Sequence, residues 1–261
     1  MKKQETSKIL NNKKLQNDYY QADLEAPSIA PLVVPGQFIH IRFPALQHKV
    51  LRRPFSVFDI NKNIISIVYK IVGEGTQHFA TLQAGEELDL LGPLGNGYTI
   101  PVPDSLPVIV AGGYGAAATY LIARTSPVPC LCLIGGRSQE DVLLVDNFKA
   151  AGATVKVATE DGSQGHKGMV TDLLQEVFEE YSSENLAVYA CGPNAMLKRV
   201  SEIVLNQGLD AEVSLDHAMC CGVGACYACV VKMKAYNEEG WQYVRTCRDG
   251  PVFNASKIYW D

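Results

Sequence analysis

The chain has 261 residues, of which 47% are hydrophobic and 20% are charged, so it is long enough for two or three domains and is neither disordered nor low in complexity. Lys and Arg number 23 against 28 acidic residues, and the formal net charge of −5 argues against a nucleic-acid-binding protein.

The N-terminal residues include lysines but no apolar run of the length of a secretory signal, so we expect a cytoplasmic protein. Residues 105–123 carry no charge and are long enough to be considered as a membrane span. Pro107 and the glycines that follow divide this segment into a strand and a helix, so we expect no contact with a membrane.

Three parts of the chain follow different patterns. Short apolar runs separated by Gly, Pro and Asn predict an antiparallel β-barrel within residues 1–101. Strands that alternate with helical stretches predict a parallel sheet with helices in residues 102–210. Residues 211–261 contain short irregular elements around clustered cysteines. The expected fold is therefore a multidomain β plus α/β protein.

The most informative stretch of the barrel segment is Arg53, Pro54, Phe55 and Ser56. An arginine suited to a phosphate, an aromatic ring suited to a flat heterocycle and a hydroxyl are groups that a flavin dinucleotide needs. An edge strand with a surface arginine is the alternative interpretation, because a proline within a strand marks an edge or a bulge.

A second stretch of the barrel segment begins with the strand-like residues Val68, Tyr69 and Lys70. A turn with Gly75 and Thr76 follows, and its backbone N–H groups could contact a pyrophosphate. The alternative is a plain turn before a short helix.

Two glycine-containing turns in the second segment stand between a strand and a helix, which is the setting of a nucleotide-binding turn. The first turn contains Gly112, Gly113 and Gly115, and the second contains Cys191, Gly192 and Pro193. Ligands of an open α/β sheet lie beyond the carboxyl ends of its strands, so both turns should line one crevice, with a nicotinamide as a plausible occupant.

Two details of this crevice leave alternatives open. Glu160 and Asp161 follow a third strand and either bind a ribose or form a turn. Cys191 either faces the nicotinamide or is a small packing residue.

Five of the eight cysteines lie in the last fifth of the chain, which favours a metal site over disulfides in a reducing compartment. Cys221, Cys226 and Cys229 have the C-x4-C-x2-C spacing of plant-type [2Fe-2S] proteins, and Cys247 supplies a fourth thiolate. A structural zinc site is one alternative, although zinc ligands more often form two short knuckles. Four thiols without metal are a further alternative. Cys220 is interpreted as a neighbour of the ligands.

The motifs RPFS, GEGT, LLGPLGNGY, AGGYG, TEDGS, CGPNAM, CCGVGACYAC and CRDGPVF occur in an order that resembles the ferredoxin-reductase superfamily. More narrowly, they resemble the electron-transfer subunits of class 1B dihydroorotate dehydrogenases. The resemblance covers nearly the whole chain, and the cysteine motif with CRDGPVF is its most specific part.

This resemblance implies three cofactors. FAD would be bound by Arg53 through Ser56, by Val68 through Lys70, and by Gly75 with Thr76. NAD would bind the α/β domain, and Cys221, Cys226, Cys229 and Cys247 would hold the [2Fe-2S] cluster. The implied partner is an FMN-containing catalytic subunit, in a heterotetramer that serves pyrimidine biosynthesis and passes electrons from FMN through the cluster and FAD to NAD.

The sequence departs from this family at two places. Tyr114 and three alanines stand where the family has a glycine-rich turn followed by prolines, and Cys220 and His217 precede the cluster motif without an assigned role. No candidate base for proton abstraction from a substrate is found, so substrate oxidation is expected on the partner. Related subunits of hydrogenases, sulfite reductases or NAD-dependent ferredoxin oxidoreductases, and a zinc-stabilised binding module, are the alternatives.

Overall fold

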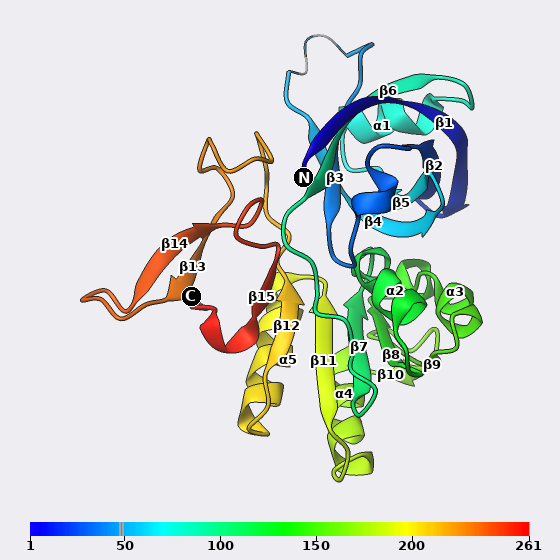
Figure 1. Cartoon of the computed structure of the whole chain (residues 1–261). Coiled ribbons are helices and arrows are strands. Elements are labelled where there is room, and N and C mark those ends of the chain that lie inside the picture. Colours follow the sequence, from blue (N-terminus) through cyan, green and yellow to red (C-terminus); the bar gives the residue numbers. More distant parts are fainter. Residues whose placement is uncertain (47, 49, 261) are drawn as a thin grey trace.

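The structure is a computed structural model that describes residues 1–46, 48 and 50–260. Figure 1 shows a β-barrel, a sheet flanked by helices below it, and a C-terminal part that lies beside both. The antiparallel barrel and the parallel sheet that the sequence predicts are thereby confirmed.

Six antiparallel strands close the barrel in the order β1-β2-β5-β4-β3-β6. Its elements are β1 (Lys3–Gln16), β2 (Tyr19–Glu25), the 3-10 helix η1 (Ala30–Leu32), β3 (Phe38–Arg42), β4 (Arg53–Asn61), β5 (Ile64–Lys70), helix α1 (Glu74–Thr81) and β6 (Glu87–Leu94). The strand alternation places residues such as Ile39, Ile41 and Ile67 in the barrel core.

The first two strands of the barrel are not evident from the apolar runs of the sequence, which begin only near residue 35. β1 is mostly polar, and only Ser7 and Ile9 of its fourteen residues are fully buried. Its place is determined by pairing with β2 on one side and β6 on the other, which closes the barrel.

The second sheet has seven strands in the order β10-β9-β8-β7-β11-β12-β15, and all are parallel except the last. Its elements are β7 (Leu106–Gly112), α2 (Gly115–Thr125), β8 (Leu131–Gly136), η2 (Gln139–Asp141), α3 (Val145–Ala150), β9 (Thr154–Thr159), β10 (His166–Lys167), α4 (Val170–Glu180), β11 (Leu186–Cys191), α5 (Asn194–Asn206), β12 (Ala211–Ser214) and β15 (Val252–Asn254).

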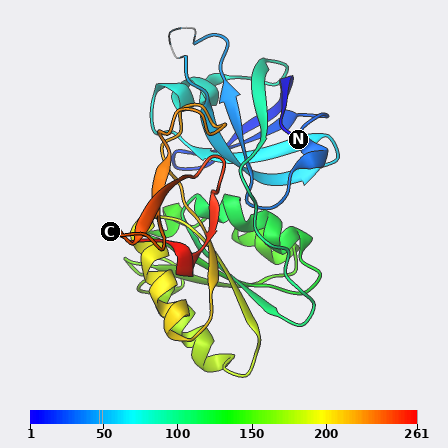
Figure 2. The same cartoon turned by 60° about the vertical axis from the view of Figure 1, so that its left-hand side comes forward.

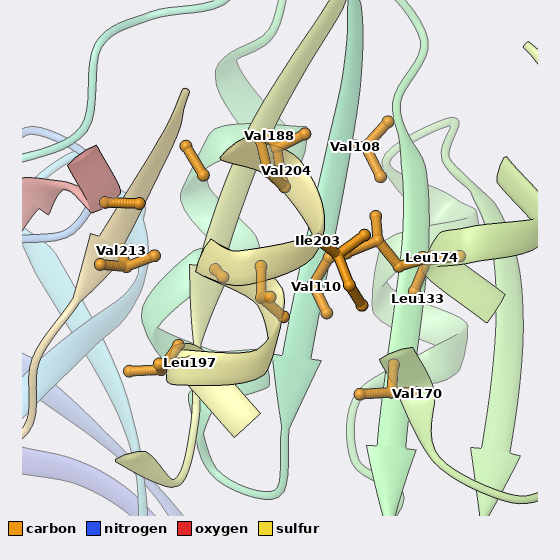
Figure 3. Close-up of a cluster of buried hydrophobic side chains, with 14 of the residues drawn as sticks. Val108, Val110, Leu133, Val170, Leu174, Val188, Leu197, Ile203, Val204 and Val213 are labelled. Atoms are coloured by element: carbon orange, nitrogen blue, oxygen red, sulfur yellow. The ribbon is translucent and has the colours of Figure 1, made fainter. Parts of the chain in front are cut away.

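Both faces of this sheet are covered by helices, as its continuous apolar strands require. Val108 and Val110 of β7 pack against α4 and α5, and Figure 3 shows them in the same cluster as Ile203 and Leu174. The alternate residues of β7 pack on the opposite face against α2 and α3. Cys132 of β8 is fully buried on that second face, where it packs as a small core residue.

Residues 215–229, between β12 and β13, form a loop that we call the cysteine loop. The C-terminal part returns to the sheet after this loop. The strands β13 (Val230–Lys234) and β14 (Trp241–Arg245) form a hairpin, β15 then pairs with β12, and η3 (Ala255–Lys257) follows. The predicted division between the α/β and cysteine-containing segments falls after residue 210, whereas β12 and β15, on its later side, both belong to the large sheet.

Helix α2 connects the two larger parts of the molecule. Its residues from Gly115 to Ala123 are all buried. The Tyr120 ring lies 4.6 Å, centroid to centroid, from that of Phe58 on barrel strand β4, and it also contacts Phe148 of α3 at 5.4 Å. Within the part of the chain that the structure describes, no helix is both long enough and apolar enough to cross a membrane.

Replacing Gly115 with Ala is expected to destabilise the chain by about 2 kcal/mol, because a Cβ atom there would lie 2.2 Å from the carbonyl oxygen of Cys191. Thermal or denaturant unfolding followed by circular dichroism measures the loss. Gly73→Ala is the matched control, since a Cβ atom at that position meets nothing within 4 Å. Equal stability of Gly115→Ala and the wild type would contradict this packing argument.

Candidate functional site

Two adjoining cavities lie where the barrel meets the large sheet. We call the one of about 620 Å³ the barrel cavity and the one of about 600 Å³ the sheet cavity. Lys70, Val72 and Tyr114 line both, so the cavities share a wall. Each has the size of a site for a cofactor or another small molecule.

Most of the predicted cofactor-binding residues line these cavities. The barrel cavity is lined by Arg53, Pro54, Phe55, Ser56, Val68, Tyr69, Lys70, Thr76 and Cys191, and the sheet cavity by Lys70, Gly112, Gly113 and Pro193. Gly75, Gly115 and Gly192 line neither.

The Arg53 guanidinium is held against the first turn of α1. A Cβ atom on Gly75 would lie 2.7 Å from Nε of Arg53, so the glycine leaves the space that the arginine occupies. The guanidinium carbon also lies 5.8 Å from the centre of the Phe43 ring. A cationic group is thereby fixed at the cavity wall, where it can bind a phosphate.

Thr76 organises the same turn from within. Its hydroxyl oxygen accepts hydrogen bonds from the backbone N–H groups of Val72 at 2.9 Å and Gly73 at 3.2 Å. These bonds hold the turn between β5 and α1 in one shape beside the barrel cavity.

Two aromatic residues of the predicted set belong largely to the barrel core. Phe55 is 7% exposed and packs edge-on against Phe79, and the Tyr69 ring stacks on Phe79 at 4.5 Å. The Tyr69 hydroxyl donates to Oδ1 of Asn12 at 3.0 Å. The side chains of Phe55 and Tyr69 thus support the cavity wall as well as lining it.

Lys70 links the barrel to the α/β part at the shared wall. Its Nζ lies 3.4 Å from the Tyr19 hydroxyl and 3.6 Å from Oδ1 of Asp141. The Tyr19 hydroxyl donates to the same Asp141 oxygen at 2.9 Å, and burial, with Asp141 as the next cause, raises the Tyr19 pKa well above its usual value. The hydroxyl therefore remains a donor at neutral pH.

The carboxyl ends of three parallel strands meet at the sheet cavity. Gly112 pairs with Gly135 of β8, and Ala111 pairs with Cys191 at the end of β11. Gly115 is a packing residue at these strand ends, because a Cβ atom there would lie 2.2 Å from the backbone carbonyl oxygen of Cys191. A Cβ atom on Gly192 would meet the Met196 side chain, with Cε at 2.5 Å.

Cys191 lines the barrel cavity and not the sheet cavity. Burial raises its pKa to about 12, with Asp216 as the next cause, so the side chain is a neutral thiol near pH 7. Its 5% exposure and its place at the end of β11 agree with a small packing residue that borders the barrel cavity.

The two acidic residues after β9 have different surroundings. Glu160 lines the sheet cavity. The Asp161 carboxylate accepts from the backbone N–H of Ser163 at 2.9 Å and from its hydroxyl at 2.6 Å, which forms a turn. Glu160 is therefore the residue of this pair that can reach a ligand.

The sequence analysis missed two arginines of the sheet cavity. Arg137 follows the Gly135-Gly136 end of β8, and Arg199 lies on α5. The rule that ligands bind beyond strand ends could have identified Arg137, because this residue directly follows the apolar strand β8. No local sequence pattern identified Arg199 as a residue of the cavity.

Tyr114 stands at the boundary of the two cavities. Its hydroxyl donates to Oδ2 of Asp216 at 2.8 Å, and burial, followed by Asp216, raises its pKa well above the usual value. The departure from the family's glycine-rich turn thus places an aromatic side chain in the shared wall.

The four predicted cluster ligands lie near one another. The Cys226 side chain interacts with Cys221, and Cys247 interacts with Cys229 and also with Cys221. No three of the His, Cys, Asp or Glu side chains in residues 1–46, 48 and 50–260 are grouped around a point suited to one metal ion. Four neighbouring thiols suit the four ligand positions of a two-iron cluster.

Backbone N–H groups face the first of these cysteines. The N–H of Ala225 donates to Sγ of Cys221 at 3.3 Å. Burial acts to raise the pKa of Cys221, but hydrogen bonds from the N–H groups of Val223 and Cys226 outweigh it and lower the pKa to about 6. A thiolate is therefore favoured in the loop that would hold the cluster.

Two parts of the chain match known protein families. Residues 216–259 match the iron-sulfur cluster binding domain of dihydroorotate dehydrogenase B, and residues 109–202 match the oxidoreductase NAD-binding domain.

Solved structures share the fold over most of the chain. An NADH-dependent reduced ferredoxin-NADP oxidoreductase studied for flavin-based electron bifurcation is 30% identical, with a TM-score of 0.85 over 97% of this chain and 90% of that chain. A ferredoxin NADP+ reductase from Neisseria gonorrhoeae is 18% identical, with a TM-score of 0.65 over 82% of this chain and 94% of that chain, and this likeness concerns the fold alone.

Curated relatives match nearly end to end. The electron transfer subunit of dihydroorotate dehydrogenase B (NAD(+)) from Desulforamulus reducens is 35% identical over 94% of both chains. The subunit of the same name from Enterococcus faecalis is 38% identical over 98% of both chains. This chain therefore belongs to the family of electron transfer subunits of NAD(+)-dependent dihydroorotate dehydrogenase B.

Proposed function

We propose that this chain passes electrons between NAD, bound in the sheet cavity, and an FMN-containing catalytic partner, through FAD in the barrel cavity and a [2Fe-2S] cluster on its four C-terminal cysteines. The partner oxidises dihydroorotate for pyrimidine biosynthesis, and the two subunits form a heterotetramer with two copies of each. Eight free cysteines suit a reducing compartment, in agreement with a cytoplasmic enzyme.

One observation carries this proposal. Phe38 and Met219 both line the barrel cavity, and both belong to the apolar cluster that contains Cys229 and Cys247. Two of the cluster ligands thus belong to an apolar cluster that reaches the wall of the barrel cavity. When bound, flavin supplies two-electron chemistry and an iron-sulfur cluster supplies one-electron transfer, so neighbouring sites suit a relay.

The barrel cavity has the groups that FAD requires. Arg53 supplies a cation for a phosphate, and Thr76 fixes the turn with Gly75 at which backbone N–H groups can reach a pyrophosphate. The cavity wall beside these groups is formed by Pro54, Ser56, Val68 and Lys70. The positions of Phe55 and Tyr69 in the barrel core give these groups a rigid support.

The sheet cavity has the groups that NAD requires. The backbone at Gly112, Gly113 and Pro193 leaves room for a pyrophosphate at two strand ends, and Arg137 adds a positive charge. Glu160 is placed to accept hydrogen bonds from a ribose. The cavities share a wall, so a nicotinamide can approach the flavin there.

A second candidate is an NADH-dependent ferredoxin oxidoreductase, which is favoured by the 30% identity and the TM-score of 0.85 with the bifurcating enzyme's chain. The two candidates differ in the partner that supplies or receives electrons at the cluster.

The test uses protein purified without oxygen, alone and co-expressed with a candidate FMN-containing partner. We expect flavin, iron and sulfide in both samples, with flavin and cluster absorbance that bleaches on addition of NADH. Dihydroorotate should bleach both only in the complex. Zinc without sulfide would contradict the cluster assignment, and bleaching by reduced ferredoxin but never by dihydroorotate would favour the second candidate.

Replacing Cys221 with Ser is expected to abolish cluster retention and leave flavin bound, because the thiolate is a ligand and the barrel cavity is a separate site. Cys220→Ser is the matched control and should retain the cluster. Iron and sulfide per chain, with the electron paramagnetic resonance (EPR) spectrum of the reduced protein, give the result. Loss of iron and sulfide in Cys220→Ser with retention in Cys221→Ser would show that the ligand set begins one residue earlier.

Replacing Glu160 with Gln is expected to weaken NADH binding about tenfold, because a hydrogen bond from a ribose hydroxyl to a charged acceptor is lost. Binding of NADPH should change less, so the preference for NADH should fall. Titrations with NADH and with NADPH measure the ratio of the two dissociation constants. Glu179→Gln, which removes the same charge from the exposed side of α4, serves as the control, and an unchanged ratio in Glu160→Gln would refute the assignment.

A further inference from the structure

The outer face of barrel strand β3 is covered by the cysteine loop. Alternation along the strand turns Ile39 and Ile41 into the barrel core and Phe38 and His40 to the outside. The two outward residues are nevertheless only 3% and 0% exposed. Figures 1 and 2 both show the loop after β12 reaching up to the barrel at β3, and this loop buries them.

The contact between strand and loop is made at Gly222. Its φ of +70° and its lack of a side chain allow the backbone to lie against the His40 ring, since a Cβ atom there would lie 2.7 Å from Nδ1 and 2.6 Å from Cε1. Gly222 stands between Cys221 and Cys226, in the segment that must wrap around the cluster. The ring is therefore a direct neighbour of the cluster-binding backbone.

His40 is a polar group in an apolar setting. Neither Nδ1 nor Nε2 has a hydrogen-bond partner among the described residues, and the neighbouring ring on β3 is that of Phe38, at 5.6 Å between centroids. Burial, with Arg52 as a further cause, lowers the pKa of His40 to about 4, so the neutral ring carries one N–H donor. A buried donor without an acceptor is unfavourable, which indicates that the acceptor is a group bound by the loop.

We propose that His40 is a positioning residue for the [2Fe-2S] cluster, with its ring N–H donating a hydrogen bond to a sulfur atom of the cluster or of its thiolate ligands. This inference rests on the proposed function, because it requires the cluster in the loop. Sulfur atoms become more negative when the cluster is reduced, so the hydrogen bond stabilises the reduced form and raises the reduction potential.

This hydrogen bond affects the direction of electron flow between the cluster and the flavin. A more positive cluster potential favours electrons on the cluster over electrons on the neighbouring flavin. A barrel residue thus adjusts a cofactor that is bound by the C-terminal part of the chain. A purely structural histidine would leave the potential unchanged.

The decisive measurement is pulsed EPR of the reduced cluster in the full chain labelled with 15N-histidine. We expect a nitrogen coupling from an imidazole in the wild type and in His217→Gln and His166→Gln, and its loss in His40→Gln. His217 is included because it lies close before the loop, and His166 because it lies on the far strand β10.

An EPR-monitored redox titration gives the second readout. His40→Leu should lower the equilibrium constant for cluster reduction by about tenfold, which is about 59 mV for one electron. His40→Gln keeps an N–H donor and should restore part of this shift. His166→Gln should have the wild-type potential.

The outcomes separate this inference from the proposed function. A wild-type protein without the EPR signal of a [2Fe-2S] cluster would refute the proposed function and the inference with it. A normal cluster signal without imidazole coupling, or a coupling lost in His217→Gln instead, would overturn the role of His40 alone. Should His40→Leu fail to fold, the labelled wild type with His217→Gln and His40→Gln still decides the question.

Discussion

The close approach of helix α2 to both the large sheet and the barrel is the constraint on which the arrangement of the cavities depends. The helix begins at Gly115, where no side chain fits against the end of β11, and continues with three alanines. Small residues bring the helix axis near the sheet on one side, while Tyr120 reaches Phe58 of the barrel on the other. A bulkier helix start would separate the two parts and open the wall that the cavities share.

Close packing also holds the cysteine loop against the barrel. The outer face of β3 would be exposed in an isolated barrel, and here it supplies Phe38 to a cluster with Cys229 and Cys247. The C-terminal part is also held by β15 in the large sheet. The metal-binding segment is therefore fixed against two rigid bodies, which suits a cofactor whose distance to its neighbour must remain constant.

Sequence patterns predicted the features that depend on local spacing. The cysteine spacing, the glycine turns and the apolar runs of β3 to β6 each carry a strong local signal, and the fold class followed from them. β1 was missed because its place comes from barrel closure and its residues are largely polar. β2 was missed with it, although Tyr19, Ala22 and Leu24 are buried in that strand. The placement of Cys191 on the barrel side, the role of Arg199 and the contact of His40 with Gly222 depend on tertiary packing between distant segments, which no local pattern encodes.

The shared wall of Lys70, Val72 and Tyr114 has a thermodynamic consequence. A ligand that shifts these side chains on one side changes the affinity on the other, and linkage makes the effect reciprocal. Whatever factor a ligand in the barrel cavity contributes to affinity in the sheet cavity, a ligand in the sheet cavity contributes in return. The hydrogen bond between Tyr114 and Asp216 holds one side chain of this wall, so a ligand that breaks it from either cavity changes the affinity of the other.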